Sequence, residues 1–149
     1  MLKNLAMLAM FSVLAGCASH NVQVYSQIDN ANKTITVPAG AGGLKGKLKQ
    51  ALANDGWKMV VYGGPSVTEG EVGAKTKLEQ YDTFNSRYQL TVSSEQFDLC
   101  IKGLSPDIIY DVSIIDTKSG AEVLTVNGKG CEPDAVKAFM KALHGKMTG

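Results

Sequence analysis

The chain has 149 residues, of which 44% are hydrophobic and 19% charged, a composition that fits one globular domain and excludes a disordered or coiled-coil chain. Its 15 basic and 14 acidic residues nearly balance, so there is no surplus of positive charge to hold a nucleic-acid backbone. Arg87 is the sole arginine, which leaves few of the bidentate contacts favoured for phosphate groups. The composition therefore argues against nucleic-acid binding.

The N-terminus has the pattern of an export signal. Lys3 precedes an apolar run at 5–14, which is too short to cross the roughly 30 Å hydrocarbon core of a membrane as a helix. The sequence Leu14-Ala-Gly-Cys17 resembles the lipobox of bacterial lipoproteins, in which a signal peptidase cuts before a lipid-modified cysteine. The resemblance implies that residues 1–16 are removed and that Cys17 becomes the acylated first residue, anchored in a membrane.

The residue after Cys17 bears on sorting. Ala18 stands where an aspartate would resemble the inner-membrane retention signal of enteric bacteria. The resemblance therefore implies a protein anchored in the outer membrane and facing the periplasm. The alternative for Cys17, an ordinary thiol in a buried N-terminal helix, would need an apolar segment without a polar face.

Cys100 and Cys131 are the other two cysteines, and an oxidising periplasm favours a bridge between them. Closing a loop of about 30 residues would stabilise the fold by roughly 3 to 4 kcal/mol. Two free buried thiols are the alternative. A redox-active or metal-binding cysteine pair is a third alternative. The sequence has no Cys-x-x-Cys motif, and His20 and His144 lie near the two ends of the chain, far from the spacing of metal ligands.

The polar segment 17–32 is expected to be a lipidated, flexible tether, and residues 33–149 a single periplasmic domain. Leucines and alanines at helical spacing predict a helix over 44–54 that ends at Gly56, and Pro133 begins a second helix that ends at Gly145. His144 is expected to cap the carbonyl groups of that second helix. Runs of β-branched or alternating residues predict strands at 34–37, 57–62, 87–93, 110–116 and 122–126, with a shorter run at 97–101 and a weakly patterned partner at 75–82.

The order β-α-β-β-β-β-α predicts an α/β (α+β) two-layer sandwich, with two helices on one face of a mixed, mostly antiparallel sheet. The segment Ile114-Ile-Asp-Thr-Lys-Ser-Gly-Ala-Glu-Val123 resembles a hairpin common in TolB N-terminal and curli-assembly-type periplasmic lipoprotein domains. That resemblance implies a fold and no functional residue.

The glycine-rich segment 40–48 follows a strand and opens a helix, as phosphate-binding loops do. It does not fit the Walker pattern, which would need glycine at Ala41 and a hydroxyl at Leu48. We therefore expect no nucleotide and a plain turn followed by a solvated lysine face. The alternative is an anionic partner at the helix N-terminus, held by Lys45 and Lys49.

Catalytic and metal-binding patterns are not found. The two histidines lie far in sequence from any candidate nucleophile, there is no G-x-S-x-G elbow, and no calcium-loop pattern occurs. We expect no enzyme, no cofactor and no metal.

Tyr81 and Phe84 flank a predicted turn, where aromatic side chains are candidates for contact with a partner. The alternative is that they close the end of the core.

Taken together, these patterns favour a non-enzymatic accessory or assembly lipoprotein that binds another envelope protein through the 63–86 loop or an open sheet edge. The alternative is a periplasmic inhibitor or immunity lipoprotein that blocks a cell-wall-degrading enzyme. An inhibitor should present an ordered aromatic or acidic loop, and an assembly factor a broader apolar patch or an open edge.

Overall fold

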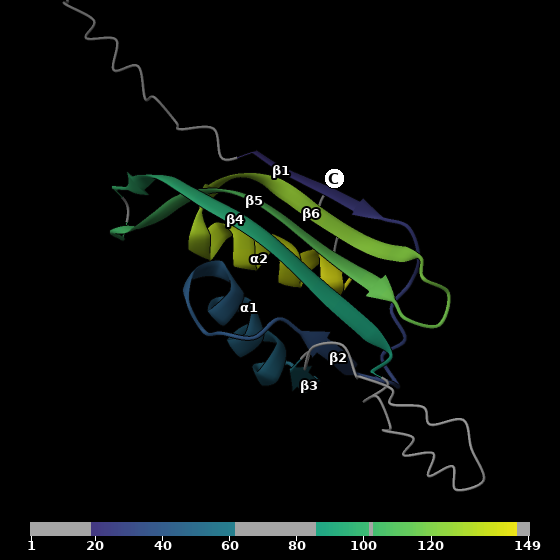
Figure 1. Cartoon of the computed structure of the whole chain (residues 1–149). Helices are drawn as coiled ribbons and strands as arrows, with labels where there is room; N and C mark the ends of the chain where they lie inside the picture. The colour runs from purple at the N-terminus through teal and green to yellow at the C-terminus, as the bar shows by residue number, and fades with distance from the viewer. Residues whose placement is uncertain (1–18, 62–85, 102, 146–149) are drawn as a thin grey trace, which may run out of the picture.

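The computed structural model describes residues 19–61, 86–101 and 103–145, which form one mixed six-stranded sheet and two helices. In chain order the elements are β1 (Ser19–Val24), β2 (Thr34–Val37), α1 (Gly43–Asn54), β3 (Lys58–Val61), β4 (Tyr88–Cys100), β5 (Ser105–Asp116), β6 (Glu122–Cys131) and α2 (Glu132–Leu143). The strands lie side by side in the order β1-β6-β5-β4-β2-β3. Figure 1 shows both helices on one side of this sheet. The predicted two-layer α+β sandwich is therefore confirmed.

The sheet combines a parallel and an antiparallel part. β2 pairs parallel with β3 on one side and with β4 on the other, so β2, α1 and β3 form the predicted βαβ unit. The other pairs are antiparallel. β4 and β5 form one hairpin, β5 and β6 form a second, and β1 pairs with the outer side of β6. The predicted hairpin over 110–126 is confirmed and is longer than expected, because β5 begins at Ser105 and β6 continues to Cys131.

Helix α1 packs on the sheet through a single leucine stripe. Leu44, Leu48 and Leu52 are fully buried at the predicted helical spacing. The helix ends as predicted at Gly56, which has a φ of +82°. The Gly56 N–H donates to the Ala53 carbonyl and the Trp57 N–H to the Leu52 carbonyl, a Schellman arrangement that satisfies the last carbonyls of the helix.

Helix α2 covers the antiparallel half of the sheet. Pro133 lies in its first turn, where the missing N–H costs nothing, and Gly145 follows its end with a φ of +65°. Phe139 and Leu143 are buried against the sheet, with Val136 and Met140 half-buried beside them. The shared core consists of apolar residues from both helices and from strands β2 to β6.

The expectation of a flexible tether over 17–32 is wrong for the described part of that segment. Residues 19–24 form β1, which pairs with β6 along its whole length. Val22 packs against the core, and the chain after β1 is held by the Tyr25 N–H, which donates to the Val123 carbonyl, and the Asp29 N–H, which donates to the Tyr88 hydroxyl. The exposed edge of β6 supplies backbone partners, so a polar sequence with little apolar area still becomes a strand. The domain therefore includes residues 19–32, which were expected to precede it.

Two further expectations are refined. The runs at 87–93 and 97–101 are one strand, β4, which continues through a bulge between Gln96 and Asp98. The predicted strand at 75–82 and nearly all of the 63–86 loop lie outside the described residues.

Candidate functional site

The face of the sheet opposite the helices is a continuous polar surface between β1 and β4. Val22, Val112 and Val126 face the helices and the core. Because side chains alternate along a strand, the residues directly before and after each of these valines point to the opposite face. Strand register places their side chains in two cross-strand rows. We call this surface the open face; its two rows are Gln23, Thr125, Ser113 and Thr91, and Asn21, Asn127, Asp111 and Ser93.

Hydrogen bonds organise the centre of the open face. The Ser113 and Thr125 hydroxyl oxygens lie 3.1 Å apart, and both side chains are buried by their neighbours. Hydrogen bonds from these two hydroxyl groups to the Glu122 carboxylate hold the pKa of Glu122 below its ordinary value. The open face therefore carries a negative charge on Glu122, beside a row of side chains that can form hydrogen bonds.

Among the described residues, strand β1 is an edge of the sheet, since β6 is its one partner strand. Its position is fixed by His20, whose Nδ1 lies 2.7 Å from the Tyr110 hydroxyl. Burial raises the pKa of Tyr110 to about 12, so this hydroxyl stays protonated. In the part of the chain that the structure describes, the outer N–H and C=O groups of β1 face away from the sheet, and another strand can pair with such an edge.

A second feature is a group of large apolar side chains at the β4–β5 turn. Ile101 is 97% exposed and Leu104 is 84% exposed. Leu104 also has a φ of +50°, a left-handed conformation that disfavours leucine. Figure 1 shows this hairpin extending beyond the helices at one end of the sheet. We call these residues the apolar tip; they are Phe97, Leu99, Ile101, Leu104 and Ile109.

A disulfide joins Cys100 to Cys131 at the base of the apolar tip, as predicted. Their Cα atoms are 5.8 Å apart, although β5 lies between the strands that carry them. Strands two positions apart in a flat sheet would be roughly 9.6 Å apart. The end of β4 therefore curls toward β6, and the bridge fixes the hairpin in that position.

The N-terminus of α1 has a carboxylate partner within the chain. Glu132 is 3% exposed, and its Oε1 lies 2.5 Å from the Lys47 Nζ. Its Oε2 also lies beside Gly43, the first residue of α1. A carboxylate of the chain itself therefore lies beside the first residue of α1, near where an anionic partner was considered.

The two candidate lysines of α1 are half-buried. The Lys49 Nζ donates to the carbonyl oxygens of Gly40 at 2.9 Å and Pro38 at 3.3 Å, so it holds the glycine-rich turn. The Lys45 ammonium lies close to Gly40, where a Cβ would come within 2.9 Å of it. Position 46 requires glycine for a steric reason, because a Cβ there would lie 1.9 Å from the Ala41 carbonyl oxygen. These contacts fit the expected plain turn.

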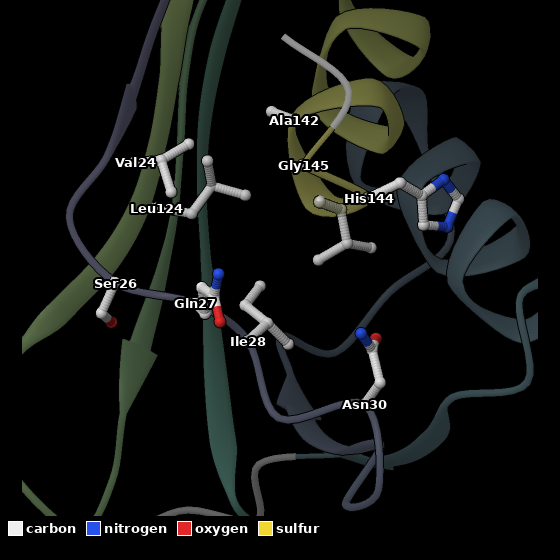
Figure 2. A pocket seen from close by; sticks show the side chains of 10 residues that line it. Val24, Ser26, Gln27, Ile28, Asn30, Leu124, Ala142, His144 and Gly145 are labelled. Atoms are coloured by element: carbon white, nitrogen blue, oxygen red, sulfur yellow. The ribbon is translucent and has the colours of Figure 1, made fainter.

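A shallow groove of about 260 Å³ lies between the β1–β2 connection and the end of α2. Figure 2 shows its two sides, with Gln27, Ile28 and Asn30 on one and His144 on the other. His144 is the C-cap residue of α2, and its N–H donates to the Met140 carbonyl, but its side chain reaches the other helix, where Nε2 lies 2.9 Å from the Asp55 Oδ1. The lining combines aliphatic groups with a few amide and hydroxyl groups.

Asp55 connects the C-terminal ends of both helices. Burial opposes ionisation of Asp55, but Lys33, His144 and the Trp57 indole N–H outweigh it and hold its pKa below the ordinary value of 3.8.

In the parts of the chain that the structure describes, no group of three or more histidine, cysteine, aspartate or glutamate side chains could hold a metal ion.

Three predicted site residues, Cys17, Tyr81 and Phe84, lie outside the described residues. Sequence reasoning missed β1 and the apolar tip. Alternation of Val22 and Val24 with polar residues was the available signal for β1. Phe97, Leu99 and Ile101 alternate as a strand does, but their exposure depends on the bulge and on how far the hairpin extends past the helices.

No protein-family model matches the chain, and no curated protein does. Solved structures similar to it include the two that follow. The PelC dodecamer from Paraburkholderia phytofirmans is 14% identical, with a TM-score of 0.52 over 89% of this chain and 100% of that one. A single-residue variant of the same dodecamer is 13% identical, with a TM-score of 0.50 over 85% of this chain and 95% of that one. At this identity the likeness shows the fold alone. Neither described helix is long and apolar enough to cross a membrane.

Proposed function

We propose that this chain is a lipoprotein of the bacterial cell envelope, anchored through Cys17, that acts as a non-enzymatic accessory or assembly protein. It binds another envelope protein through the open face of its sheet and the adjacent β1 edge. The observation that carries this proposal is the one-sided sheet: among the described residues, two helices cover one face, the other face is polar, and β1 has a partner strand on one side only.

The lipobox and the disulfide support the location. Leu14-Ala-Gly-Cys17 has the residue types of a lipoprotein processing site, and Ala18 favours outer-membrane sorting. The Cys100–Cys131 bridge is the kind of bond that persists outside the cytosol. Both features fit a domain held on the periplasmic side of the outer membrane.

The open face supports the binding role. Amide, hydroxyl and carboxylate groups in register can form many hydrogen bonds with a partner, and non-obligate protein interfaces are about as polar as the rest of a protein surface. The β1 edge can add a partner strand through backbone hydrogen bonds. An open edge is a feature expected of an assembly factor and not of an active-site plug. The PelC chains that share the fold form a dodecamer, so in that protein the fold carries contacts between chains.

Site-specific photo-crosslinking in living cells tests the proposal. A photoreactive residue at Asp111, on the open face, should capture one envelope protein reproducibly. The matched control is Lys137, which is also exposed but lies on the outer side of α2. Capture from Lys137 alone would contradict the assigned surface. Capture of a peptidoglycan-cleaving enzyme would support the inhibitor alternative instead.

Anchoring is tested separately. Cys17→Ser should leave the precursor uncleaved by the lipoprotein signal peptidase and without acyl chains. A Cys17→Ser variant that is still processed and acylated would refute the lipobox.

A further inference from the structure

We infer that the apolar tip inserts into the headgroup region of the same membrane leaflet that holds the acyl chains of Cys17. This inference rests on the proposed anchoring at Cys17. It adds a second membrane contact and thereby fixes the orientation of the domain, with the sheet standing on the leaflet and the open face directed sideways into the periplasm.

The apolar tip is built for contact with something apolar. Ile101, Leu104 and Leu99 are 97%, 84% and 59% exposed, and they gather at one hairpin end. Scattered surface leucines are ordinary in soluble proteins, but contiguous exposed groups of this kind mark interaction sites. The left-handed conformation of Leu104 has an energetic cost, and its side chain gains no burial within the domain in return.

The sheet register places the anchor at the same end as the tip. Ser19, the first residue of β1, is level with Lys129 on β6 and Ile109 on β5. Ser105, where β5 begins at the tip, is four residues before Ile109, or roughly 13 Å along the strand. Cys17 is two residues before Ser19 and can reach at most about 7 Å from it. The tip therefore extends some 6 Å or more past the furthest level that Cys17 can reach, within the 5 to 10 Å typical of interfacial insertion.

Polar groups around the tip limit its depth. Asp98 is exposed between Phe97 and Leu99, and Glu95 is exposed on the strand behind them. The Lys129 ammonium lies 4.0 Å from the centre of the Phe97 ring, which places a cation at the border of the apolar group. Charges at this border would stay among the headgroups while Ile101 and Leu104 reach the acyl boundary. The leaflet fits better than a second copy, because the anchor itself brings a lipid surface to this end of the domain.

The test uses the full lipidated protein in vesicles of phosphatidylethanolamine, phosphatidylglycerol and phosphatidylcholine brominated on its acyl chains. Ile101→Trp places a fluorescent side chain at the tip, and Lys118→Trp places one in the β5–β6 turn at the opposite end of the sheet. Trp57 is 5% exposed in the core and contributes the same background to both variants. Emission from Ile101→Trp should fall as the brominated fraction rises, and emission from Lys118→Trp should not.

The outcomes separate this inference from the anchoring on which it rests. If both variants float with the vesicles and neither is quenched, the anchor stands and membrane contact by the tip is refuted. If the protein does not float, the anchoring proposal fails and this inference fails with it. A photoreactive residue at Leu104 identifies the occupant: lipid adducts support the inference, whereas dimers of this chain without quenching would show that a second copy covers the tip.

Discussion

Removing the Cys100–Cys131 bridge should destabilise the domain by roughly 3 to 4 kcal/mol. The bridge closes a loop with a sequence separation of 31. In the chain-entropy model, closing a loop of this length removes about 12 cal/mol/K from the unfolded chain, or about 3.7 kcal/mol at 25 °C. For a domain of this size, such a loss corresponds to a fall in Tm of roughly 10 °C or more.

The assay is urea unfolding of the oxidised wild type, of Cys100→Ser, of Cys131→Ser and of the double variant. Each single variant removes the whole bridge, so the three variants should lose the same free energy of unfolding. The urea midpoint should fall in all three variants, and the slope m should rise because the unfolded chain is less compact without the bridge. Additive losses, with the double variant clearly below both single variants, would refute the bridge as the source of the stability.

Three other substitutions test contacts within the fold. Gly128→Ala should cost about 1 to 3 kcal/mol, because its Cβ would lie 1.9 Å from the Ser19 carbonyl oxygen and push β1 off the sheet; unchanged hydrogen-exchange protection of β1 would contradict this. Glu132→Gln should cost about 1 to 3 kcal/mol in urea unfolding, since it removes the buried charge that pairs with Lys47 at the start of α1, and a neutral result would show that the pair contributes nothing net. The folded-state pKa of Asp55 lies below 3.8, so its stabilising contribution is complete above that pH and is lost as the pH falls through the folded value. Asp55→Asn should therefore show a shallower loss of stability below that pH than the wild type, and identical acid-unfolding curves would contradict the assigned contacts.

Elements with a strong local signal could be predicted from the sequence. The leucine stripe of α1, the glycine that ends it and the alternating hairpin of β5 and β6 are each encoded in one continuous stretch of sequence, so pattern alone was sufficient. Pro133 likewise marked the start of α2 because proline is favoured in a first turn.

Features that depend on distant partners could not be predicted. β1 has a polar sequence and becomes a strand because the edge of β6 offers it backbone hydrogen bonds, a fact set by topology. Glu132 was not singled out, because its partner Lys47 lies on the other helix. The exposure of Ile101 and Leu104 follows from the length of β4 and β5 beyond the helices, which no local pattern encodes.

The position of the disulfide gives it a second consequence beyond stability. Cys100 and Cys131 hold the end of β4 close to β6, and Ile101 comes immediately after Cys100. Stability alone would be served by a bridge elsewhere in the sheet, whereas a bridge at this base fixes the direction in which the apolar side chains project. The Cys131→Ser variant separates the two roles when it carries Ile101→Trp and is kept below its unfolding temperature. A folded, vesicle-bound variant whose tip is no longer quenched would show that the bridge positions the tip, and undiminished quenching would restrict the bridge to stabilising the fold.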